Sequence, residues 1–240
     1  MVVQTNGMES GGSPQNKHIN YSMFVKVISY TKPAEDMNLD TMADLISYCA
    51  RVSNPSNQNN NETSDKLLRY CMKNSHWSIF EMANVCCEIV TTRDIARQIL
   101  RHRSFTFQEF SQRYADPTKT LDFVVREARL QDTKNRQNSV EVSNDDLSNK
   151  WQKKQLELIA KSKETYEWAI SNGIAKEQAR AVLPEGNTVS RMYMNGSIRS
   201  WLHYIDLRSG NGTQKEHRLI ANQCKVEISK LIPILFSSDE

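Results

Sequence analysis

The stretch Arg101-His102-Arg103-Ser104-Phe105-Thr106-Phe107-Gln108-Glu109-Phe110-Ser111-Gln112-Arg113-Tyr114 is the most informative part of this chain. It brings three arginines, one histidine and one carboxylate into fourteen residues. The guanidinium group is a rigid fork of donors that matches phosphate bidentately. Several such forks close together predict a pocket for a polyphosphate or for more than one phosphorylated ligand. The structural alternative is a basic surface turn with a buried histidine.

The residues around this stretch predict its local structure. The apolar, β-rich run over residues 82–92 predicts a buried strand. Residues 93–102 follow as a predicted helix with His102 on its apolar face. Residues 104–114 predict a loop or a short extended segment. Alternation along an extended segment would put Glu109, Ser111 and Arg113 on one side, as a phosphate cradle.

The rest of the chain reads as a mixture of strands and helices without an internal repeat. The spacing of apolar residues predicts strands over 23–30 and 188–195, and helices over 40–52, 64–73, 151–171, 176–182, 197–207 and 216–231. No alternating βαβ series and no glycine-rich dinucleotide loop is present, which indicates one α+β domain over residues 21–240. Residues 1–20 predict a disordered tail, and the polar stretch 127–149 predicts an insertion or mobile loop.

Composition excludes several classes of protein. The 240 residues are 38% hydrophobic and 25% charged, and no apolar run reaches the roughly 20 residues of a membrane span. A net charge of +3 is too small to argue for nucleic acid. The five cysteines and five histidines lack metal-binding spacing, so no metal is expected. Reduced cysteines favour the cytoplasm, either of the protein's own cell or of a host.

Two further segments carry candidate functional residues. In His76-Trp77-Ser78-Ile79-Phe80-Glu81, an extended backbone would put His76 and Ser78 on one side; a capped turn with a half-buried histidine is the alternative. Arg199 and His203 are four apart and share a predicted helical face, and Arg208 ends that helix. A cation there is also favoured by the helix dipole alone. Arg180, in Ala-Arg-Ala-Val-Leu-Pro, reads by itself as a surface arginine.

These motifs together resemble the flavin-dependent thymidylate synthases. The pattern Arg-His-Arg, seven residues, then Ser-X-Arg is similar to the signature of that family, and the resemblance spans residues 22–235. The segment 76–81 resembles the family's His-X-X-Pro-Phe-Glu-His, but Ile79 replaces proline and Met82 replaces the last histidine. His203 stands where the family often has asparagine.

The resemblance implies the fold, the reaction and the site. It implies an α+β domain with a mixed or antiparallel sheet packed by long helices, assembled as a homotetramer with shared active sites. It implies conversion of dUMP to dTMP with bound FAD, NADPH as reductant and methylenetetrahydrofolate as one-carbon donor. The flavin would contact His76, Ser78, Arg101, His102, Arg103, Glu109, Arg199 and His203. The substrate dUMP would contact Gln98, Arg101, Glu109, Phe110, Ser111, Gln112, Arg113, Arg180 and Arg208.

The chemistry assigns Arg208 the catalytic role. Uracil C5 is a poor nucleophile until N3 loses its proton, and an arginine beside the ring favours that anion. No protein nucleophile is needed, because a flavin would supply the hydride. The alternative is a non-catalytic nucleotide- or RNA-binding protein that stacks bases on Phe105, Phe107 and Phe110. A hydrolase or a flavoreductase without methyl transfer is a lesser third possibility.

Overall fold

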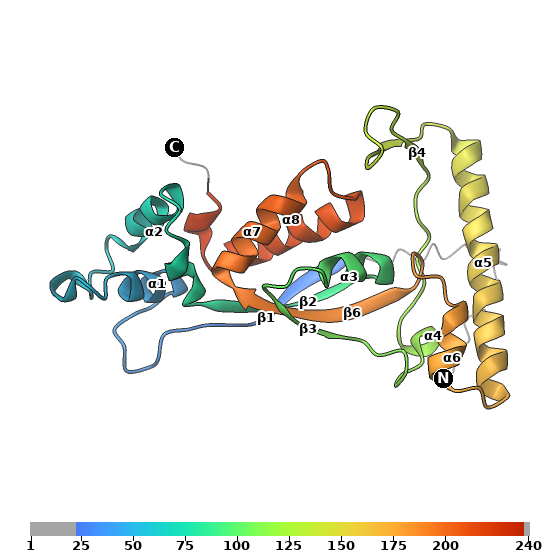
Figure 1. The fold of residues 1–240 in the computed structure, drawn as a ribbon, viewed down its shortest axis with the longest axis horizontal. Helices are drawn as coiled ribbons and strands as arrows, with labels where there is room; N and C mark the ends of the chain where they lie inside the picture. Colours follow the sequence, from blue (N-terminus) through green and yellow to red (C-terminus); the bar gives the residue numbers. More distant parts are fainter. Residues whose placement is uncertain (1–22, 238–240) are drawn as a thin grey trace, which may run out of the picture.

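A four-stranded sheet forms the middle of the molecule. The computed structural model describes residues 23–237, so the predicted tail over 1–20 lies outside the described residues. The strands are ordered β1 (Phe24–Tyr30), β2 (Asn84–Thr92), β6 (Val189–Ser197) and β3 (Thr106–Glu109) (Figure 1). Every neighbouring pair is antiparallel, so the sheet is antiparallel rather than mixed. The predicted strands and the predicted extended segment after Ser104 are therefore confirmed.

Within the described part of the chain, helices cover one face of the sheet. Along the central strands, Val85, Ile89 and Met194 are fully buried, while Glu88 and Tyr193 lie on the opposite face and remain partly or largely accessible. Successive side chains of a strand point to opposite faces, so this alternation assigns one face to the core.

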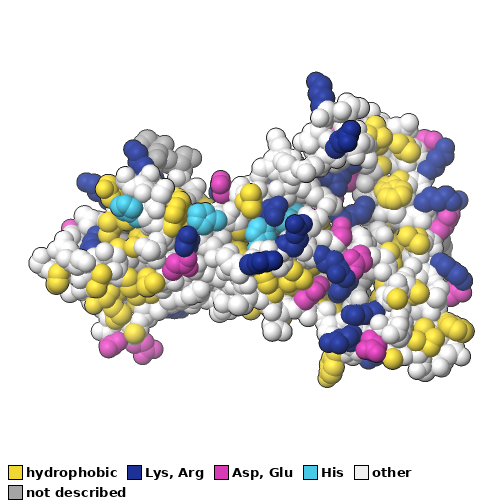
Figure 2. Space-filling view, viewed as in Figure 1, with side chains coloured by type: hydrophobic (Ala, Val, Ile, Leu, Met, Phe, Trp, Pro, Cys, Tyr) yellow, Lys and Arg dark blue, Asp and Glu magenta, His cyan; other side chains and the backbone are white. Residues whose placement is uncertain are grey.

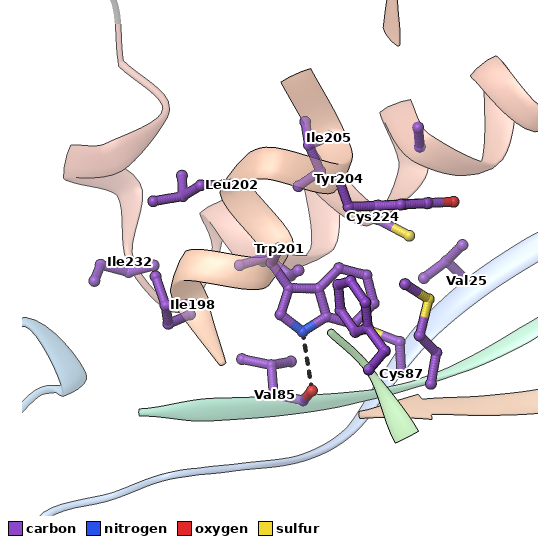
Figure 3. Close-up of a cluster of buried hydrophobic side chains, with 14 of the residues drawn as sticks. Val25, Val85, Cys87, Ile198, Trp201, Leu202, Tyr204, Ile205, Cys224 and Ile232 are labelled. Carbon is purple, nitrogen blue, oxygen red and sulfur yellow. Dashed lines mark hydrogen bonds between the residues drawn. The ribbon is translucent and has the colours of Figure 1, made fainter. Parts of the chain in front are cut away.

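Three helices pack on the buried face of the sheet: α3 (Arg93–Ile99), α7 (Ile198–Ser209) and α8 (Lys215–Ser229) (Figure 1). Trp201 of α7 lies at their centre and is fully buried. Its indole Nε1 donates a 3.0 Å hydrogen bond to the carbonyl oxygen of Val85 (Figure 3). The Phe105 ring meets the indole edge-on at 4.9 Å between centroids. This cluster fixes the start of α7 and the turn before β3 to the same strands.

The molecule is elongated, with smaller groups of helices at the two ends of the sheet (Figure 1). One end holds α1 (Met42–Ala50), α2 (Ser64–Lys73) and the short 3-10 helices η1 (Pro55–Asn57), η2 (Trp77–Glu81) and η4 (Pro233–Leu235). Helices α1 and α2 confirm the helices predicted over residues 40–52 and 64–73. Packing of η2 against α7 ties this end to the central layer.

The long helix α5 (Asp145–Ser171) lies at the other end, beside α4 (Pro117–Thr120), α6 (Lys176–Ala179) and the 3-10 helix η3 (Arg180–Val182) (Figure 1). A second hydrophobic cluster holds this end together; it consists of Phe123, Ile159, Tyr166, Ala169, Ala179 and Leu183. Helix α5 ends at Ser171, with Asn172 as its C-cap. Gly173 follows with a φ of +78°, a conformation that glycine adopts readily.

The segment 127–149 differs from its prediction as a mobile loop. It contains the hairpin of β4 (Arg129–Gln131) and β5 (Ser139–Glu141) and the beginning of α5. The helix begins at Asp145 rather than at residue 151, because the Asn144 side chain accepts a hydrogen bond from the Leu147 amide and caps it. Polar residues in this first part of α5 hid the helical pattern.

Candidate active site

The turn after α3 carries the Arg-His-Arg motif. Helix α3 ends at Ile99, before the predicted end at His102, and the His102 amide closes the turn on the Ile99 carbonyl at 3.0 Å. The chain turns here so that Phe105 enters the core. Arg101 and Arg103 are exposed on either side of a half-buried His102. Their charges are therefore free to attract an anionic ligand.

His102 lies beside the predicted catalytic arginine. Arg208, in the last turn of α7, donates from Nε to Nε2 of His102 at 2.9 Å. The Tyr204 ring packs edge-on against the imidazole at 4.9 Å between centroids. Burial, and then the charges of Arg208 and Arg101, lower the pKa of His102 to about 4. His102 is therefore a neutral acceptor at neutral pH, and it orients the guanidinium rather than repelling it.

Of the two alternatives for residues 76–81, the structure has a turn and not an extended backbone: Trp77–Glu81 form the 3-10 helix η2, without a side-chain cap. Isoleucine in place of proline leaves its amide available to the turn, and Phe80 is buried in the core. His76 and Ser78 are both exposed. The His76 ring meets Tyr70 edge-on at 5.9 Å.

Arg199 and His203 of α7 both face η2, which confirms that they share one side of the helix. Arg199 Nη1 donates to the Glu81 carboxylate at 2.9 Å, and the His203 ring lies 4.7 Å from the Trp77 ring. A hydrogen bond from Ser197, and then Arg199, lower the pKa of Glu81. Sequence reasoning did not assign Glu81 a role, although it ends the motif that begins at His76.

A cavity of about 500 Å³ opens beside this group. Its lining combines aromatic and aliphatic side chains with a few polar ones: Met72, Trp77, Leu202, His203, Ile205, Asp206, Ser209, Asn222, Lys225, Leu235, Phe236 and Ser237. A lining that is mainly apolar and aromatic with a few polar groups suits a ring-shaped ligand. Figure 2 shows histidine and basic side chains on the face that carries α7 and α3.

Glu109 ends strand β3 and is held by two neighbours. Its Oε1 accepts from Ser190 Oγ at 2.7 Å and lies 3.4 Å from Arg93 Nη1. Both partners were missed by sequence reasoning, because neither lies near the motif in the chain. The carboxylate is thus anchored to β6 and α3, and its other oxygen remains for a ligand.

The predicted cradle of Glu109, Ser111 and Arg113 is wrong in its geometry. Pairing of β3 with β6 stops at Glu109, and the Tyr114 amide then closes a turn on the Ser111 carbonyl at 3.1 Å. Alternation does not continue through a turn, so the three side chains do not share one side of a strand. Ser111 and Arg113 are exposed on this turn.

The same turn lies near the predicted substrate residue Arg180. Lys176 Nζ of α6 donates to the Tyr114 carbonyl at 2.8 Å, which connects the turn to the element preceding η3. Arg180 begins η3 and is half-buried. Gln112 is buried, and its Nε2 has no hydrogen-bond partner among residues 23–237. A buried donor without a partner is costly, and a ligand oxygen would satisfy it.

One of the three aromatic residues proposed for base stacking, Phe105, is not available for it. Phe105 is 7% exposed and is covered by Trp201 and Tyr204. Phe107 and Phe110 are half-buried. The stacking platform that the nucleic-acid alternative requires is therefore absent at Phe105, since that ring belongs to the core.

Gln98 lies behind the His102–Arg208 pair within a network of polar side chains that no sequence pattern indicates. Its Nε2 donates to Gln214 Oε1 at 2.8 Å, and its Oε1 lies 3.2 Å from His217 Nδ1. Both partners lie more than a hundred residues after Gln98 in the chain. Glu216, next to them, completes a group that sequence reasoning missed.

Residues 23–237 contain no cluster of three or more histidine, cysteine, aspartate or glutamate side chains able to hold a metal ion. In the same part of the chain, no helix combines the length and apolar character of a membrane span. The predicted site residues instead form three groups in one chain: beside η2, at the end of α3 and α7, and at the turn after β3.

Comparison with known proteins gives a consistent result. Residues 27–234 match the family model Thy1, described as thymidylate synthase complementing protein. The chain is 51% identical to a probable flavin-dependent thymidylate synthase of Paramecium bursaria Chlorella virus 1, over 88% of this chain and 96% of the viral protein. It is 48% identical to the flavin-dependent thymidylate synthase of Synechocystis, over 91% of this chain and 100% of that protein.

A solved structure supports the fold. The crystal structure of a UMP/dUMP methylase, PolB of Streptomyces cacaoi bound with 5-Br dUMP, superposes with a TM-score of 0.75. It covers 89% of this chain and 93% of the methylase chain at 23% sequence identity. At that identity, the likeness establishes the shared fold.

Proposed function

This chain belongs to the Thy1 family, the flavin-dependent thymidylate synthases, and we propose from this that it methylates dUMP to dTMP with methylenetetrahydrofolate as one-carbon donor. Its flavin is FAD, and NADPH is the reductant. The reaction would belong to the de novo synthesis of dTMP. The flavin dependence and the reaction are proposed from the activity for which the relatives are named. The residues of the site support the details that follow.

The contact between Arg208 and His102 carries the catalytic assignment. The neutral imidazole takes only the Nε hydrogen of Arg208, and the two terminal nitrogens keep their N–H groups for a ligand. A guanidinium directed at the uracil ring stabilises negative charge as N3 loses its proton. The anion makes C5 nucleophilic, so Arg208 acts as the electrophilic residue of the reaction.

The exposed charges fit an anionic dinucleotide cofactor. Arg101 and Arg103 present guanidinium forks to solvent, which suit the phosphates of FAD and dUMP. His203 lines the cavity together with Trp77, against which a flat ring would lie. Arg199 faces η2, Ser78 is part of η2, and His76 immediately precedes it. When bound, FAD supplies the hydride for the new methyl group.

The remaining predicted substrate residues hold dUMP. Glu109, fixed by Ser190, accepts from a ribose hydroxyl, and Gln98 contacts the nucleotide from behind Arg208. The turn after β3 supplies Phe110, Ser111, Gln112 and Arg113, with Arg180 beside it. The unpartnered Gln112 amide supports a ligand oxygen at this turn.

No protein side chain is required to attack the pyrimidine. Burial raises the pKa of Cys87 to about 12 and raises that of Cys224 well above its ordinary value. Burial likewise raises the pKa values of Cys71 and Cys86, so these thiols are protonated at neutral pH. All five cysteines are free, which supports a cytoplasmic location in the protein's own cell or in a host.

Complete sites require more than one copy of the chain, and we place the protein in a homotetramer. Three groups of predicted ligand residues in one chain, rather than one pocket, support sites shared between subunits. The outer face of the sheet adds support, because it carries the partly exposed Tyr193 and the pair of Arg191 with Glu88. A second copy would cover this face.

The visible spectrum of the purified protein tests the proposal. We expect a flavin band that anaerobic NADPH bleaches, faster with dUMP than without it, followed by dTMP when the folate is added. A colourless protein that takes up no FAD would contradict the proposal. A flavin that NADPH reduces without dTMP formation would instead identify a flavoreductase.

A further inference from the structure

A continuous chain of hydrogen bonds runs behind the proposed site, from the Tyr204 hydroxyl to the Glu216 carboxylate. The hydroxyl lies 3.1 Å from His217 Nε2, and His217 Nδ1 lies 3.2 Å from Gln98 Oε1. Gln98 Nε2 donates to Gln214 Oε1 at 2.8 Å, and Gln214 Nε2 donates to Glu216 Oε2 at 3.0 Å. Of the four other residues in this network, Glu216 and His217 belong to α8, Gln214 is its N-cap, and Tyr204 comes from α7.

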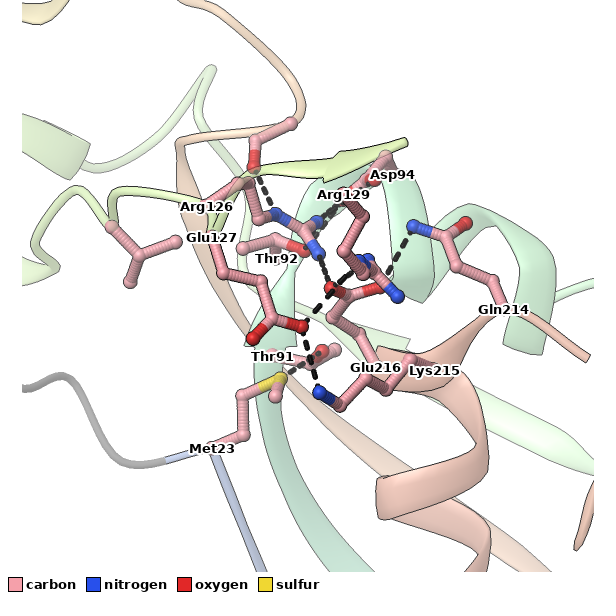
Figure 4. Close-up of polar contacts among 12 residues, drawn as sticks. Met23, Thr91, Thr92, Asp94, Arg126, Glu127, Arg129, Gln214, Lys215 and Glu216 are labelled. Carbon is pink, nitrogen blue, oxygen red and sulfur yellow. Dashed lines mark hydrogen bonds and ion pairs between the residues drawn. The ribbon is translucent and has the colours of Figure 1, made fainter. Parts of the chain in front are cut away.

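The Glu216 end of the chain is ionised. Glu216 is 6% exposed, its Oε1 accepts a hydrogen bond from Arg129, and Arg126 Nη1 lies 3.2 Å from the same oxygen (Figure 4). Burial acts to raise its pKa, but the hydrogen bond from Arg129 and the charge of Arg126 outweigh it, and the pKa is lowered. An ionised carboxylate accepts hydrogen bonds and donates none.

The ionised carboxylate of Glu216 determines which group donates and which accepts in every hydrogen bond from Glu216 to Tyr204. Since Glu216 only accepts, Gln214 must turn its amide nitrogen toward it and its oxygen toward Gln98. Gln98 then directs its nitrogen to Gln214 and its oxygen to His217. His217 carries its proton on Nδ1, and Nε2 accepts from the Tyr204 hydroxyl. Reversing one amide would set oxygen against oxygen or nitrogen against nitrogen.

These bond directions also determine where the remaining N–H and the remaining oxygen lone pair of the Gln98 amide lie. Its amide keeps one N–H and one oxygen lone pair, each held in a known direction. We propose that Gln214, Glu216 and His217 are positioning residues that lock the Gln98 amide, so that it offers a fixed donor and a fixed acceptor to the pyrimidine nucleotide. This inference rests on the proposed function, in which Gln98 contacts dUMP.

The chain also borders the catalytic pair. Tyr204 packs against His102, and the His102 and His217 rings lie 6.3 Å apart. One buried layer therefore orients the amide of Gln98 and supports the imidazole that holds Arg208. A glutamine left free to flip would present the wrong group to the nucleotide half of the time.

The first test is dUMP affinity of the FAD-loaded protein, measured by calorimetry. In Glu216→Gln the end group both donates and accepts, so the amides are no longer directed. We expect the dissociation constant for dUMP to rise about tenfold, as for a misplaced buried hydrogen bond. Glu164→Gln, on the exposed surface of α5, is the matched control and should bind as the wild type does.

A charge relocation separates positioning from simple structural support. In Gln214→Glu/Glu216→Gln, the acceptor-only carboxylate moves one step along the chain and still receives the Gln98 N–H. The ion pairs of residue 216 with Arg126 and Arg129 are lost, although these arginines keep Asp94 and Glu127, whereas the direction of the Gln98 amide is kept. We expect dUMP affinity within about threefold of wild type. A double variant as weak as Glu216→Gln would overturn the inference.

The His217 tautomer gives a readout without any ligand. We expect ring ¹⁵N shifts of histidine-labelled protein to place the His217 proton on Nδ1, with the signal assigned by its loss in His217→Asn. A proton on Nε2 would overturn the inference, and so would wild-type dUMP affinity in Glu216→Gln. A wild-type protein that binds no dUMP would contradict the proposed function and this inference together.

Discussion

Arg208 donates its Nε hydrogen to Nε2 of His102 at 2.9 Å, although the two residues are 106 positions apart in the chain. Such a pair needs a neutral imidazole, and burial together with the Arg208 charge provides one. The guanidinium is thus held by one nitrogen and directed by a group that does not compete for its charge. Four consequences concern this pair and its surroundings, and a fifth concerns the turn after β3.

Replacing Arg208 by alanine should lower the rate of dTMP formation far more than it lowers the affinity for flavin. Loss of one preorganised donor to a developing anion lowers kcat by about 10²–10³-fold. The measurement is dTMP formation, with flavin content determined on the same sample. Arg97→Ala, which removes a surface arginine paired with Glu185, is the control. Unchanged product formation in Arg208→Ala would refute the catalytic assignment.

Replacing Arg103 by alanine should weaken flavin retention. The exposed guanidinium is assigned to a phosphate of FAD, and removing one charged contact should raise the FAD dissociation constant by about tenfold. The absorbance ratio of flavin to protein after gel filtration reports the loss. Arg136→Ala, in the exposed β4–β5 loop, should retain full flavin. Full flavin in both variants would argue against the assignment of Arg103.

Gly196→Ala should destabilise the protein through the motif turn. A Cβ atom at Gly196 would lie 2.4 Å from Cδ1 of Phe105, whose ring is confined by Trp201. Overpacking of this kind costs about 1–3 kcal/mol, measurable as a lower urea midpoint. Gly186→Ala has open space around it and serves as the control. A smaller side chain at position 105, in the double variant Gly196→Ala/Phe105→Leu, should recover part of the lost stability.

Stability should fall as pH decreases from about 6.5 to 4. Burial and the charge of Arg208 lower the pKa of His217 to about 4 from an ordinary 6.5, so the unfolded chain binds more protons in this window. Stability is complete above the unfolded value and is lost below it, by up to about 1.4 kcal/mol per pH unit for the fully buried His217.

Urea unfolding at several pH values measures this dependence. The stability curve of His217→Gln should be flatter between pH 6.5 and 4 than that of the wild type. His102, whose pKa is also lowered to about 4, acts in the same window, so the curve of the variant should flatten only in part. The lowered pKa values of Glu81 and Glu216 act below about 4.5, outside most of this window. Equal slopes for wild type and variant would show that His217 does not titrate as its burial requires.

Ser111→Ala should leave the chemical step intact. If Ser111 only positions the nucleotide, kcat should change by less than about threefold while KM for dUMP rises. Steady-state kinetics with varied dUMP separates the two constants. Removal of a true nucleophile lowers kcat by about 10⁴–10⁶-fold, and a loss of that size would make Ser111 catalytic.

The local elements of the fold were predictable because each is encoded by its own residues. The apolar, β-rich run over residues 82–92 predicts β2, and helical spacing predicts α7 and α8. The predictions failed where the local pattern was interrupted. The capped start of α5 at Asn144 is polar, and the turn at Ser111 follows from where β3 loses its partner strand.

The site was predictable to a different degree. The sequence by itself determined the residue types of the motifs and, through their order, the family; it also placed Arg199 and His203 on one helical face. Only the tertiary structure decided that Arg208 meets His102, that Glu109 rests on Ser190, and that Gln98 is held from α8. Those contacts join residues about a hundred positions apart, and they form because α7 and α8 bury their apolar faces on the same side of the sheet. Short-range patterns carry the period of an element, whereas its neighbours are chosen by the packing of the whole core.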